Sequence, residues 1–352
     1  MAYLTFPHVA VTGVAACVPK QIEDIRRLDL IPASEREQHV AQIGITQRRV
    51  APEGLCSSDL CYHSAERLIA DLGWNKAEVD ALLFVSQTPD YILPATACLL
   101  QQRLGLPKEC LAFDVALGCS GWVYGLSTLA AYVDSGSVRK ALLLVGDCPT
   151  RNTSPRSTAD WPLFGDAGTC TALEFCPDHG GNLCFHLGTD GAGYADIIIP
   201  DGGFRNPVQP SSFDYEDVGN GNYATRLQTR MDGMNVFAFA LSTAPKSIKR
   251  LCERFAVDID SVDYFFLHQA NKMINDNMCK KLALVPGRCP SSMNLFGNTS
   301  CASIPLTMVT QSAHDLATRR LKNIASGFGV GLSWATAYFE TNSITVPQLI
   351  EI

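Results

Sequence analysis

Cys119 stands in the stretch DVALGCSGW (114–122), where an apolar run ends in a glycine and small residues follow. The next residues, VYGLSTLAAYVDSG (123–136), predict a helix, so the thiol lies where a strand turns into a helix. A helix N-terminus favours the thiolate and lowers its pKa from about 8.5. Such a thiolate can attack an acyl group and hold it as a thioester. The alternative is a packing cysteine, which is the interpretation we prefer for most of the fourteen cysteines.

His268 and Asn298 are the two further residues whose surroundings suggest chemistry. His268 ends the apolar run of YFFLHQANKMIND (264–276), and Asn298 lies in FGNTSCASIP (296–305). The alternatives are a core histidine and an asparagine that caps a helix. Together the two side chains can donate two hydrogen bonds to one oxygen. Such a pair stabilises the enolate that forms when a carboxylate leaves an adjacent carbon.

The glycine run SGFGVGL (326–332) opens a strand rather than a helix, which argues against a nucleotide-binding loop. We expect Gly331 or its neighbour to bring a backbone N–H close to a thioester on Cys119. With the backbone N–H of Cys119, it would form an oxyanion hole.

Three segments in the first part of the chain resemble three later segments, in the same order. EVDALLFVSQ (78–87) resembles SVDYFFLHQ (261–269), DVALGCS (114–120) resembles MNLFGNTS (293–300), and KALLLVGD (140–147) resembles GFGVGLSWATAYFE (327–340). Each segment is interpreted as a strand. Three pairs of similar segments in the same order predict two duplicated α/β halves. Residues 1–175 would carry the cysteine, and residues 176–352 the histidine and asparagine. Ligands of open α/β sheets bind at the carboxyl ends of strands, so the three residues are expected to converge.

Composition sets the broad class. The chain has 352 residues, 47% of them apolar, with a formal net charge of −7, which disfavours nucleic-acid binding. Alternating strands and helices predict an α/β fold with helices on both faces of the sheets. The N-terminal stretch reads as one strand, and residues 200–230, rich in Gly, Pro, Ser and Asn, read as a long loop. Without a signal peptide, a membrane span or a C-x-x-C pair, we expect a cytoplasmic protein with no metal site and no disulfide framework.

The combination of motifs resembles the thiolase-fold condensing enzymes, specifically the β-ketoacyl-acyl-carrier-protein synthase III family. ALGCSGWVYGL, FGDAG, LHQAN, GNTSCASIP and GFGVGLSWA follow the family's order across nearly the whole chain. The resemblance implies a five-layered αβαβα fold, a homodimer, and no tightly bound cofactor. It implies that Cys119 takes the acyl group from a coenzyme A or acyl-carrier-protein thioester. His268 and Asn298 would assist decarboxylation of a malonyl thioester, whose carbanion attacks the acyl group to give a 3-oxoacyl product.

The chain departs from the family pattern where the family contacts coenzyme A. Gln38 and Gln42 stand in place of a Trp and an Arg, which leaves Arg48 and Arg49 as the expected phosphate contacts. The Arg expected after HQAN is missing, and Met234 stands in place of the family's Asn after Gly233. These departures favour a specialised relative with another acyl donor.

Two further assignments concern the acyl pocket and the carrier. By resemblance, Leu93 closes the partner's acyl pocket where a Phe is common, so the pocket should be deeper. Lys272, Lys280 and Lys281 fall on the predicted helix after HQAN and are expected to bind the carrier or coenzyme A, the alternative being a solvated helix face.

Three other functions stay open at this point. The chain could transfer the Cys119 acyl group to a hydroxyl or amine of a small molecule, without forming a carbon–carbon bond. A non-catalytic partner subunit is disfavoured because such subunits typically lose the cysteine. A Cys-His hydrolase is disfavoured because deacylation would need water at Cys119.

Overall fold

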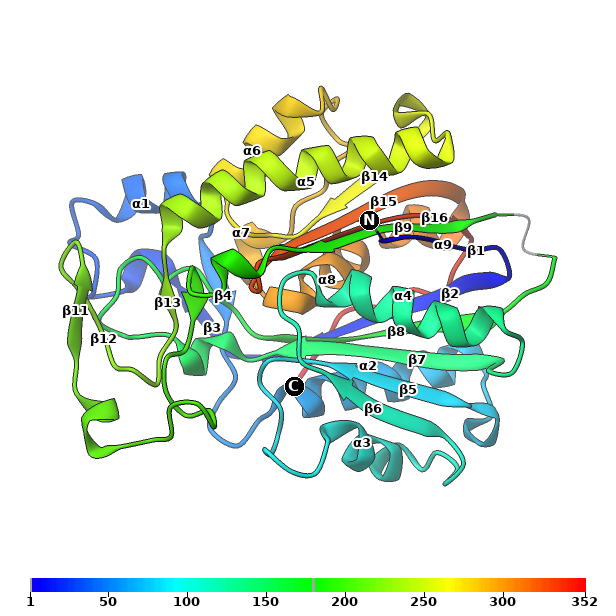
Figure 1. The fold of residues 1–352 in the computed structure, drawn as a ribbon, viewed down its shortest axis with the longest axis horizontal. Helices are drawn as coiled ribbons and strands as arrows, with labels where there is room; N and C mark the ends of the chain where they lie inside the picture. The colour runs from blue at the N-terminus through cyan, green and yellow to red at the C-terminus, as the bar shows by residue number, and fades with distance from the viewer. Residues whose placement is uncertain (1, 179–180) are drawn as a thin grey trace.

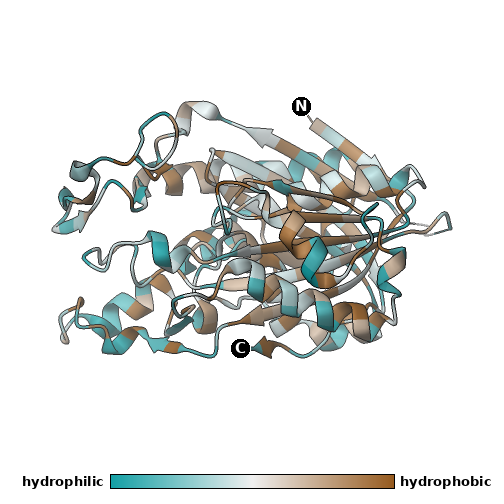
Figure 2. Cartoon of the chain, turned by 90° about the horizontal axis from the view of Figure 1, so that it is seen from below, coloured by the Kyte–Doolittle hydropathy of each residue, from teal (hydrophilic) through white to brown (hydrophobic). Residues whose placement is uncertain are grey.

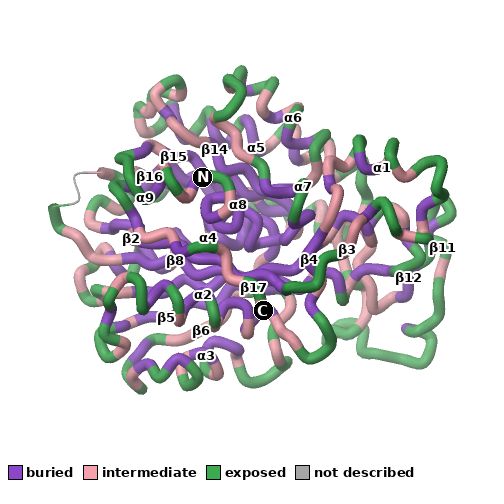
Figure 3. The backbone as a smooth tube through the Cα atoms, turned by 180° about the vertical axis from the view of Figure 1, so that it is seen from behind, coloured by how far each residue is buried: buried purple, intermediate pink, exposed green. Residues whose placement is uncertain are grey.

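The computed structural model describes residues 2–178 and 181–352. Two central β-sheets alternate with three layers of helices (Figure 1). The apolar strands lie inside, and the polar residues gather on the outer helices and loops (Figure 2). The tube coloured by burial likewise shows a buried interior and an exposed rim (Figure 3). The five-layered αβαβα fold is therefore confirmed.

The first sheet has six strands in the order β17-β2-β8-β7-β5-β6. Their bounds are β2 (Val9–Val18), β5 (Ala81–Val85), β6 (Leu111–Val115), β7 (Lys140–Asp147), β8 (Ala167–Phe175) and β17 (Ile350–Glu351). All five residues of β5, ALLFV, are buried. A continuous apolar run of this kind is what a strand covered on both faces requires.

The second sheet has five strands in the order β1-β9-β16-β15-β14. Their bounds are β1 (Ala2–Phe6), β9 (Leu183–Thr189), β14 (Tyr264–Leu267), β15 (Arg320–Gly329) and β16 (Ser333–Asn342). β14 runs parallel to β15, and β15 pairs with β16 antiparallel over its full length.

The helices form three layers around these sheets. α2 (Ser57–Leu72) and α3 (Thr96–Leu104) cover the outer face of the first sheet, and α5 (Gly233–Phe255) and α6 (Lys272–Lys281) cover the outer face of the second. α4 (Gly121–Asp134) and α8 (Ser303–Gln311) lie between the sheets and contact both. The remaining helices are α1 (Arg36–Ile43), α7 (Met293–Phe296) and α9 (Ala313–Thr318).

The two sheets share one internal order. In the first, β5-β7-β8-β2 pair in the sequence parallel, antiparallel, antiparallel. In the second, β14-β15-β16-β9 repeat that sequence of directions. The similar segments 78–87 and 261–269 thus contain the matching strands β5 and β14.

Two of the expected strands are wrong. Residues 293–296 form the short helix α7, because Met293 and Phe296 pack against other buried side chains, Met293 beside Ile25 and Leu163. Residues 327–340 are split between β15 and β16, with a turn at 330–332. Gly329 and Gly331 have φ values of 151° and 142°, which glycine adopts readily.

The N-terminal stretch forms two strands in place of the single strand expected. A turn at Pro7 separates β1 from β2, because proline has no N–H for a strand ladder. β1 pairs with β9 in the second sheet, whereas β2 and the C-terminal β17 belong to the first. The division into residues 1–175 and 176–352 stays a prediction.

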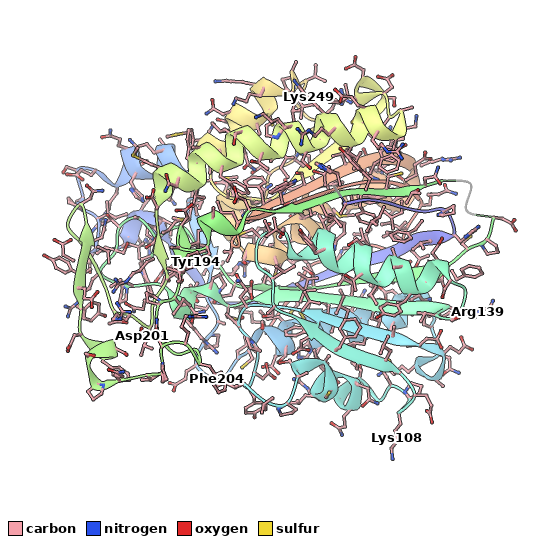
Figure 4. All side chains as sticks on the ribbon, in the orientation of Figure 1. Lys108, Arg139, Tyr194, Asp201, Phe204 and Lys249 are labelled. Atoms are coloured by element: carbon pink, nitrogen blue, oxygen red, sulfur yellow. The ribbon has the colours of Figure 1, made fainter. Side chains whose placement is uncertain are left out.

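Residues 200–230 are not one irregular loop. They contain the hairpin of β11 (Glu216–Gly219) and β12 (Asn222–Ala224), flanked by the pair β10 (Ile197–Ile198) and β13 (Arg230–Met231). An ion pair of 2.9 Å joins Arg226 to Asp201. Asp201 lies toward the end of the molecule opposite Arg139 (Figure 4). The small strands and the ion pair give this segment a defined conformation beside the site.

Candidate active site

A cavity of about 320 Å³ is lined by residues at the carboxyl ends of β5, β6 and β7 in the first sheet and of β14 in the second. Cys119, His268 and Asn298 all line it. Three segments far apart in the chain therefore meet where the sequence predicted that they would. The other walls are largely apolar and come from Ile197–Ile199, Met231, Val236 and Phe237. An apolar cavity with a few convergent polar groups is typical of a small-molecule site.

Cys119 lies between β6 and α4, and only 9% of the residue is exposed. Glycines of β15 pass directly over it. A Cβ added at Gly329 would lie 2.7 Å from the Cys119 sulfur, and one added at Gly327 would lie 2.6 Å from the Cys119 carbonyl oxygen. Real side chains do not approach this closely, so both positions require glycine. The glycine run of residues 326–332, which we expected to lie close to a thioester on Cys119, therefore does pack against Cys119.

The expectation that the helix N-terminus lowers the pKa of Cys119 is wrong for the free protein. Burial raises this pKa to about 11, a hydrogen bond with the Val330 backbone acts against that rise, and the Asp147 carboxylate adds to it. Burial outweighs the helix because it removes the water that would solvate a thiolate. The thiol is therefore protonated at neutral pH in the free protein.

The backbone group that faces the Cys119 sulfur belongs to Val330 rather than to Gly331. Val330 lines the cavity, whereas Gly331 is absent from its described lining. The next residue, Leu332, exchanges two backbone hydrogen bonds with Asp190, which turn the chain away from Cys119. Val330, the neighbour of Gly331, is therefore better placed than Gly331 to supply the second backbone N–H of an oxyanion hole.

His268 follows the last residue of β14, and its backbone N–H donates to Ser326 on β15. Its Nδ1 lies 2.8 Å from the hydroxyl oxygen of Ser303, and the ring of Phe328 packs edge-on at 5.6 Å. Burial lowers the pKa of His268 to about 3, while a hydrogen bond with the Ser300 backbone opposes this. The imidazole is therefore neutral at physiological pH.

Asn298 is held by backbone and side-chain hydrogen bonds. Its N–H donates to Leu163, and its carbonyl accepts from Gly165. Its Oδ1 accepts from the Ser300 N–H at 2.9 Å, which orients the amide. Its Nδ2 lies 3.4 Å from the Ala270 carbonyl oxygen and has a second hydrogen to offer. Asn298 thus combines a local structural role with a donor at the cavity.

Asp147 is a cavity residue that the sequence analysis missed. It ends β7, is only 1% exposed, and lines the cavity. Its carboxylate accepts hydrogen bonds from Ser86, Gln87, Thr88 and Cys301. An acid at the end of the buried run KALLLVGD was the available signal. We infer that Asp147 fixes the turn after β5, which forms one wall of the site.

Comparison with known proteins identifies the family. Residues 113–191 match the family model of 3-oxoacyl-[acyl-carrier-protein] synthase III, and residues 252–341 match the model of its C-terminal part. The β-ketoacyl-[acyl-carrier-protein] synthase III of Rhodopirellula baltica is 33% identical over 358 residues, covering 94% of this chain and 98% of the relative.

The chain belongs to the β-ketoacyl-acyl-carrier-protein synthase III family. Another synthase III, from Streptococcus pneumoniae, is 32% identical over 331 residues, 93% of this chain and 97% of the relative. The crystal structure of a 3-oxoacyl-(acyl-carrier protein) synthase from Burkholderia xenovorans superimposes with a TM-score of 0.94 at 38% identity. That match covers 100% of this chain and 99% of the other. This synthase III family member is accordingly an acyltransferase of the condensing type.

The assignment of Arg48 and Arg49 to phosphate binding is wrong for this family member. Arg48 is fully buried, where it pairs with Glu23 and donates to the Trp161 and Phe164 carbonyls. Arg49 is buried as well and donates to Glu351 at 2.6 Å and to the Pro19 carbonyl at 3.0 Å. Both guanidinium groups are held inside the fold, and neither residue belongs to the described lining of the cavity.

Arg48→Ala should therefore destabilise the fold. Removing a buried ion-pair partner leaves Glu23 and two carbonyl groups unpaired, which costs about 3 kcal/mol of unfolding free energy. Denaturant unfolding followed by tryptophan fluorescence measures this, because Trp161 packs on Arg48 at 4.6 Å. The control is Arg26→Ala, whose half-exposed ion pair with Asp24 should contribute less than about 1 kcal/mol. Equal effects of the two substitutions would contradict the structural role.

The three lysines lie on α6, but their surroundings differ. Lys272 is paired with Asp276 within the helix and lines a second cavity. Lys281 is exposed and donates to the Leu241 carbonyl at 3.0 Å. Lys280 is exposed, and the described part of the chain provides it with no hydrogen-bond or ion-pair partner. Lys280 and Lys281 remain candidates for carrier docking.

Leu93 is 84% exposed and is absent from the described lining of this chain's own cavity. Its neighbours Tyr91 and Ile92 are also largely exposed. An exposed apolar loop of this kind fits contact with a second chain. Leu93 therefore does not close the acyl pocket of its own chain.

Within residues 2–178 and 181–352, no helix has the length and apolar character needed to cross a membrane. The same residues contain no cluster of three or more His, Cys, Asp or Glu side chains suited to a metal ion.

Proposed function

We propose that this family member loads an acyl group onto Cys119 and condenses it with a malonyl thioester to give a 3-oxoacyl thioester. One observation carries the proposal: Cys119, His268 and Asn298 converge in a single apolar cavity. The substrates would be coenzyme A or acyl-carrier-protein thioesters, with no tightly bound cofactor. The relatives named above carry the same activity in their names.

In the first half-reaction, the sulfur of Cys119 attacks the carbonyl carbon of the donor thioester. The oxygen that becomes negative would accept hydrogen bonds from the backbone N–H groups of Cys119 and Val330, which form the oxyanion hole. The Cys119 proton leaves with the departing thiol. The tight packing of Gly327 and Gly329 holds these N–H groups close to the sulfur.

In the second half-reaction, the malonyl thioester loses its free carboxylate as carbon dioxide. The electron pair left behind forms an enolate, whose oxygen would accept hydrogen bonds from neutral His268 and from Nδ2 of Asn298. The enolate carbon then attacks the acyl carbonyl on Cys119. The tetrahedral intermediate collapses, the carbon–sulfur bond breaks, and the 3-oxoacyl product leaves. The Cys119 thiolate that is expelled takes up one proton from water, which restores the thiol.

Transfer of the acyl group to a hydroxyl or amine is the second candidate. It uses the same first half-reaction but no decarboxylation. None of the described residues that line the cavity favours this transfer over condensation. The named relatives are synthases. Condensation is therefore the better supported function.

Intact-mass spectrometry tests the loading step and names the donor. The protein is incubated separately with acyl-coenzyme A and acyl-carrier-protein donors of increasing chain length, and the adduct is mapped. We expect one acyl group per chain, on Cys119. Failure of every donor to label Cys119, in a folded protein, would reject the proposal.

We propose that the protein is a cytoplasmic homodimer in which Leu93 of each chain closes the acyl pocket of the other. The exposure of residues 91–93 supports this arrangement. Leu93→Phe should then favour shorter acyl donors.

Reversing the charges of Lys280 and Lys281 should weaken docking of an acidic carrier protein. The double substitution to Glu is expected to raise the apparent KM for a carrier-bound substrate roughly 10-fold at low salt. The effect should shrink at high salt, which screens surface charges, and should be small for coenzyme A substrates. Lys108→Glu, at a distant exposed site (Figure 4), is the control. An unchanged KM for the carrier would reject this docking surface.

A further inference from the structure

Gln87 is a polar residue of the catalytic cavity that the proposed condensation steps do not use. It is the second residue after β5, and it lines the cavity together with Cys119. Its backbone N–H donates to Asp147 at 2.7 Å, whereas its side-chain amide has no hydrogen-bond partner within residues 2–178 and 181–352. We propose that Gln87 selects an acyl group that carries a hydroxyl close to its thioester. This inference rests on the proposed loading of Cys119.

The side chain of Gln87 lies beside the nucleophile. A Cβ added at Gly118 would overlap the Gln87 Oε1 and would lie 2.9 Å from its Cδ, so the amide packs directly on Gly118. Gly118 immediately precedes Cys119 in the chain. The Ser86 hydroxyl and the Gln87 N–H both donate to the Asp147 carboxylate, which holds the turn in this place. The amide of Gln87 is therefore within reach of the first carbons of an acyl group on Cys119.

The glutamine at the matching position of the second sheet is used differently. Gln269 is the second residue after β14. Its Nε2 donates to the Leu267 carbonyl at 2.7 Å, and its Oε1 accepts from the Ser291 hydroxyl at 2.8 Å. Only 1% of Gln269 is exposed, whereas Gln87 is an exposed residue. The fold therefore uses the amide of Gln269 for its own hydrogen bonds and leaves the amide of Gln87 available to a ligand.

Asn152 adds a second amide to the lining of the same cavity. It follows β7 on a segment that is joined to the turn of Gln87, because the Cys148 N–H donates to the Thr88 hydroxyl at 3.0 Å. The backbone carbonyl of Asn152 accepts from the Thr229 N–H at 2.7 Å. Its side-chain amide has no hydrogen-bond partner among the described residues. Two unpartnered amides from neighbouring segments thus line a cavity whose other walls are largely apolar.

The chemistry of an amide indicates which substituent fits. A side-chain amide both donates and accepts hydrogen bonds, and so does a hydroxyl. A hydroxyl at the 3-position of an acyl group stands on the carbon two bonds from the thioester carbonyl carbon, where the Gln87 amide can reach it. A methyl in that place would displace water from the amide without replacing its hydrogen bonds, which lowers affinity. The substrate class is therefore a short 3-hydroxyacyl donor.

Two pantetheine thioesters test this preference without the nucleotide of coenzyme A or a carrier protein. One bears a 3-hydroxybutyryl group, each enantiomer being tested separately, and the other bears a 3-methylbutyryl group, which has a methyl in place of the hydroxyl. Intact-mass spectrometry measures the rate at which each donor acylates Cys119 at subsaturating concentration. We expect one enantiomer of the hydroxylated donor to react roughly 5- to 10-fold faster than the methyl donor, the usual effect of one hydrogen bond between neutral groups.

Substitutions assign the preference to the amide. Gln87→Leu keeps a side chain of similar bulk, and it should slow the hydroxylated donor and speed the methyl donor, because leucine offers only apolar contact. Asn152→Leu should reduce the preference to a smaller extent, since its amide belongs to the next segment. Gln311→Leu is the matched control, because Gln311 is exposed at the end of α8 and is absent from the described cavity lining. This control should keep the preference of the wild type.

The outcomes separate this inference from the proposed function. Equal rates for the two donors on the wild-type protein would overturn the inference, and so would a preference that survives Gln87→Leu. An equal loss with both donors in Gln87→Leu would also overturn it, because Gln87 would then act on the thioester itself. In each of these cases Cys119 is still acylated, so the proposed loading stands. Failure of every donor to label Cys119 in a folded protein would instead reject the loading, and this inference with it.

Discussion

Cys119→Ser is expected to abolish formation of the acyl-enzyme and with it the condensation. A serine hydroxyl keeps the size of the side chain but is far less ionised and less nucleophilic than a thiol. Loss of a covalent nucleophile should lower the rate by roughly four orders of magnitude or more. The burial that raises the pKa of the thiol to about 11 would keep a hydroxyl even more firmly protonated. Intact-mass spectrometry after incubation with acyl donors measures the remaining adduct.

The matched control is Cys301→Ser. Cys301 is also buried, and its thiol donates to the Asp147 carboxylate at 3.1 Å, a bond that a serine hydroxyl can replace. This variant should still be acylated. An adduct of normal stoichiometry on the Cys119→Ser protein, mapped to another residue, would contradict the assignment of Cys119.

His268→Ala and Asn298→Ala should separate the two half-reactions. Each substitution removes one hydrogen-bond donor to the enolate oxygen, and one such donor is worth roughly 100- to 1000-fold in rate. Decarboxylation of the malonyl thioester should fall by that factor, whereas acylation of Cys119 should fall much less. Carbon dioxide release and acyl-enzyme formation are measured separately on each variant.

Conservative substitutions test the reason for the effect. His268→Gln keeps an N–H donor and should recover part of the decarboxylation that His268→Ala loses. His186→Ala is a control for the loss of a buried imidazole, because His186 lies on β9, contacts Ser247 of α5, and is absent from the described cavity lining. A variant of His268 or Asn298 that loses acylation but keeps decarboxylation would reverse the proposed roles.

Much of the site could be predicted because its signals are local. Cys119, His268 and Asn298 each stand directly after an apolar run and before a polar or small-residue helix start, a pattern visible in a short window. The alternation of strands and helices likewise predicted the α/β class, and the motif order predicted the family. The shared order of β5-β7-β8-β2 and β14-β15-β16-β9 explains why residues 78–87 resemble residues 261–269, because these segments contain the matching strands β5 and β14.

Features that depend on distant contacts could not be predicted. Arg48 looked like a phosphate contact, but its partner Glu23 and the Trp161 carbonyl come from elsewhere in the chain. The pKa of Cys119 depends on how deeply the fold buries it, which a helix start does not reveal. The choice of Val330 over Gly331 depends on the hydrogen bonds that tie Leu332 to Asp190. In each case the sequence identified the segment, and a long-range contact decided its role.

The most direct test of the account follows the fate of the acyl group on Cys119. The acylated protein is isolated and mixed with a malonyl thioester labelled in its free carboxyl group, and both labelled carbon dioxide and thioester products are quantified. The account predicts one carbon dioxide and one 3-oxoacyl thioester for each acyl group lost from Cys119. Loss of the acyl group to a hydroxyl or amine acceptor, with no carbon dioxide released, would contradict it.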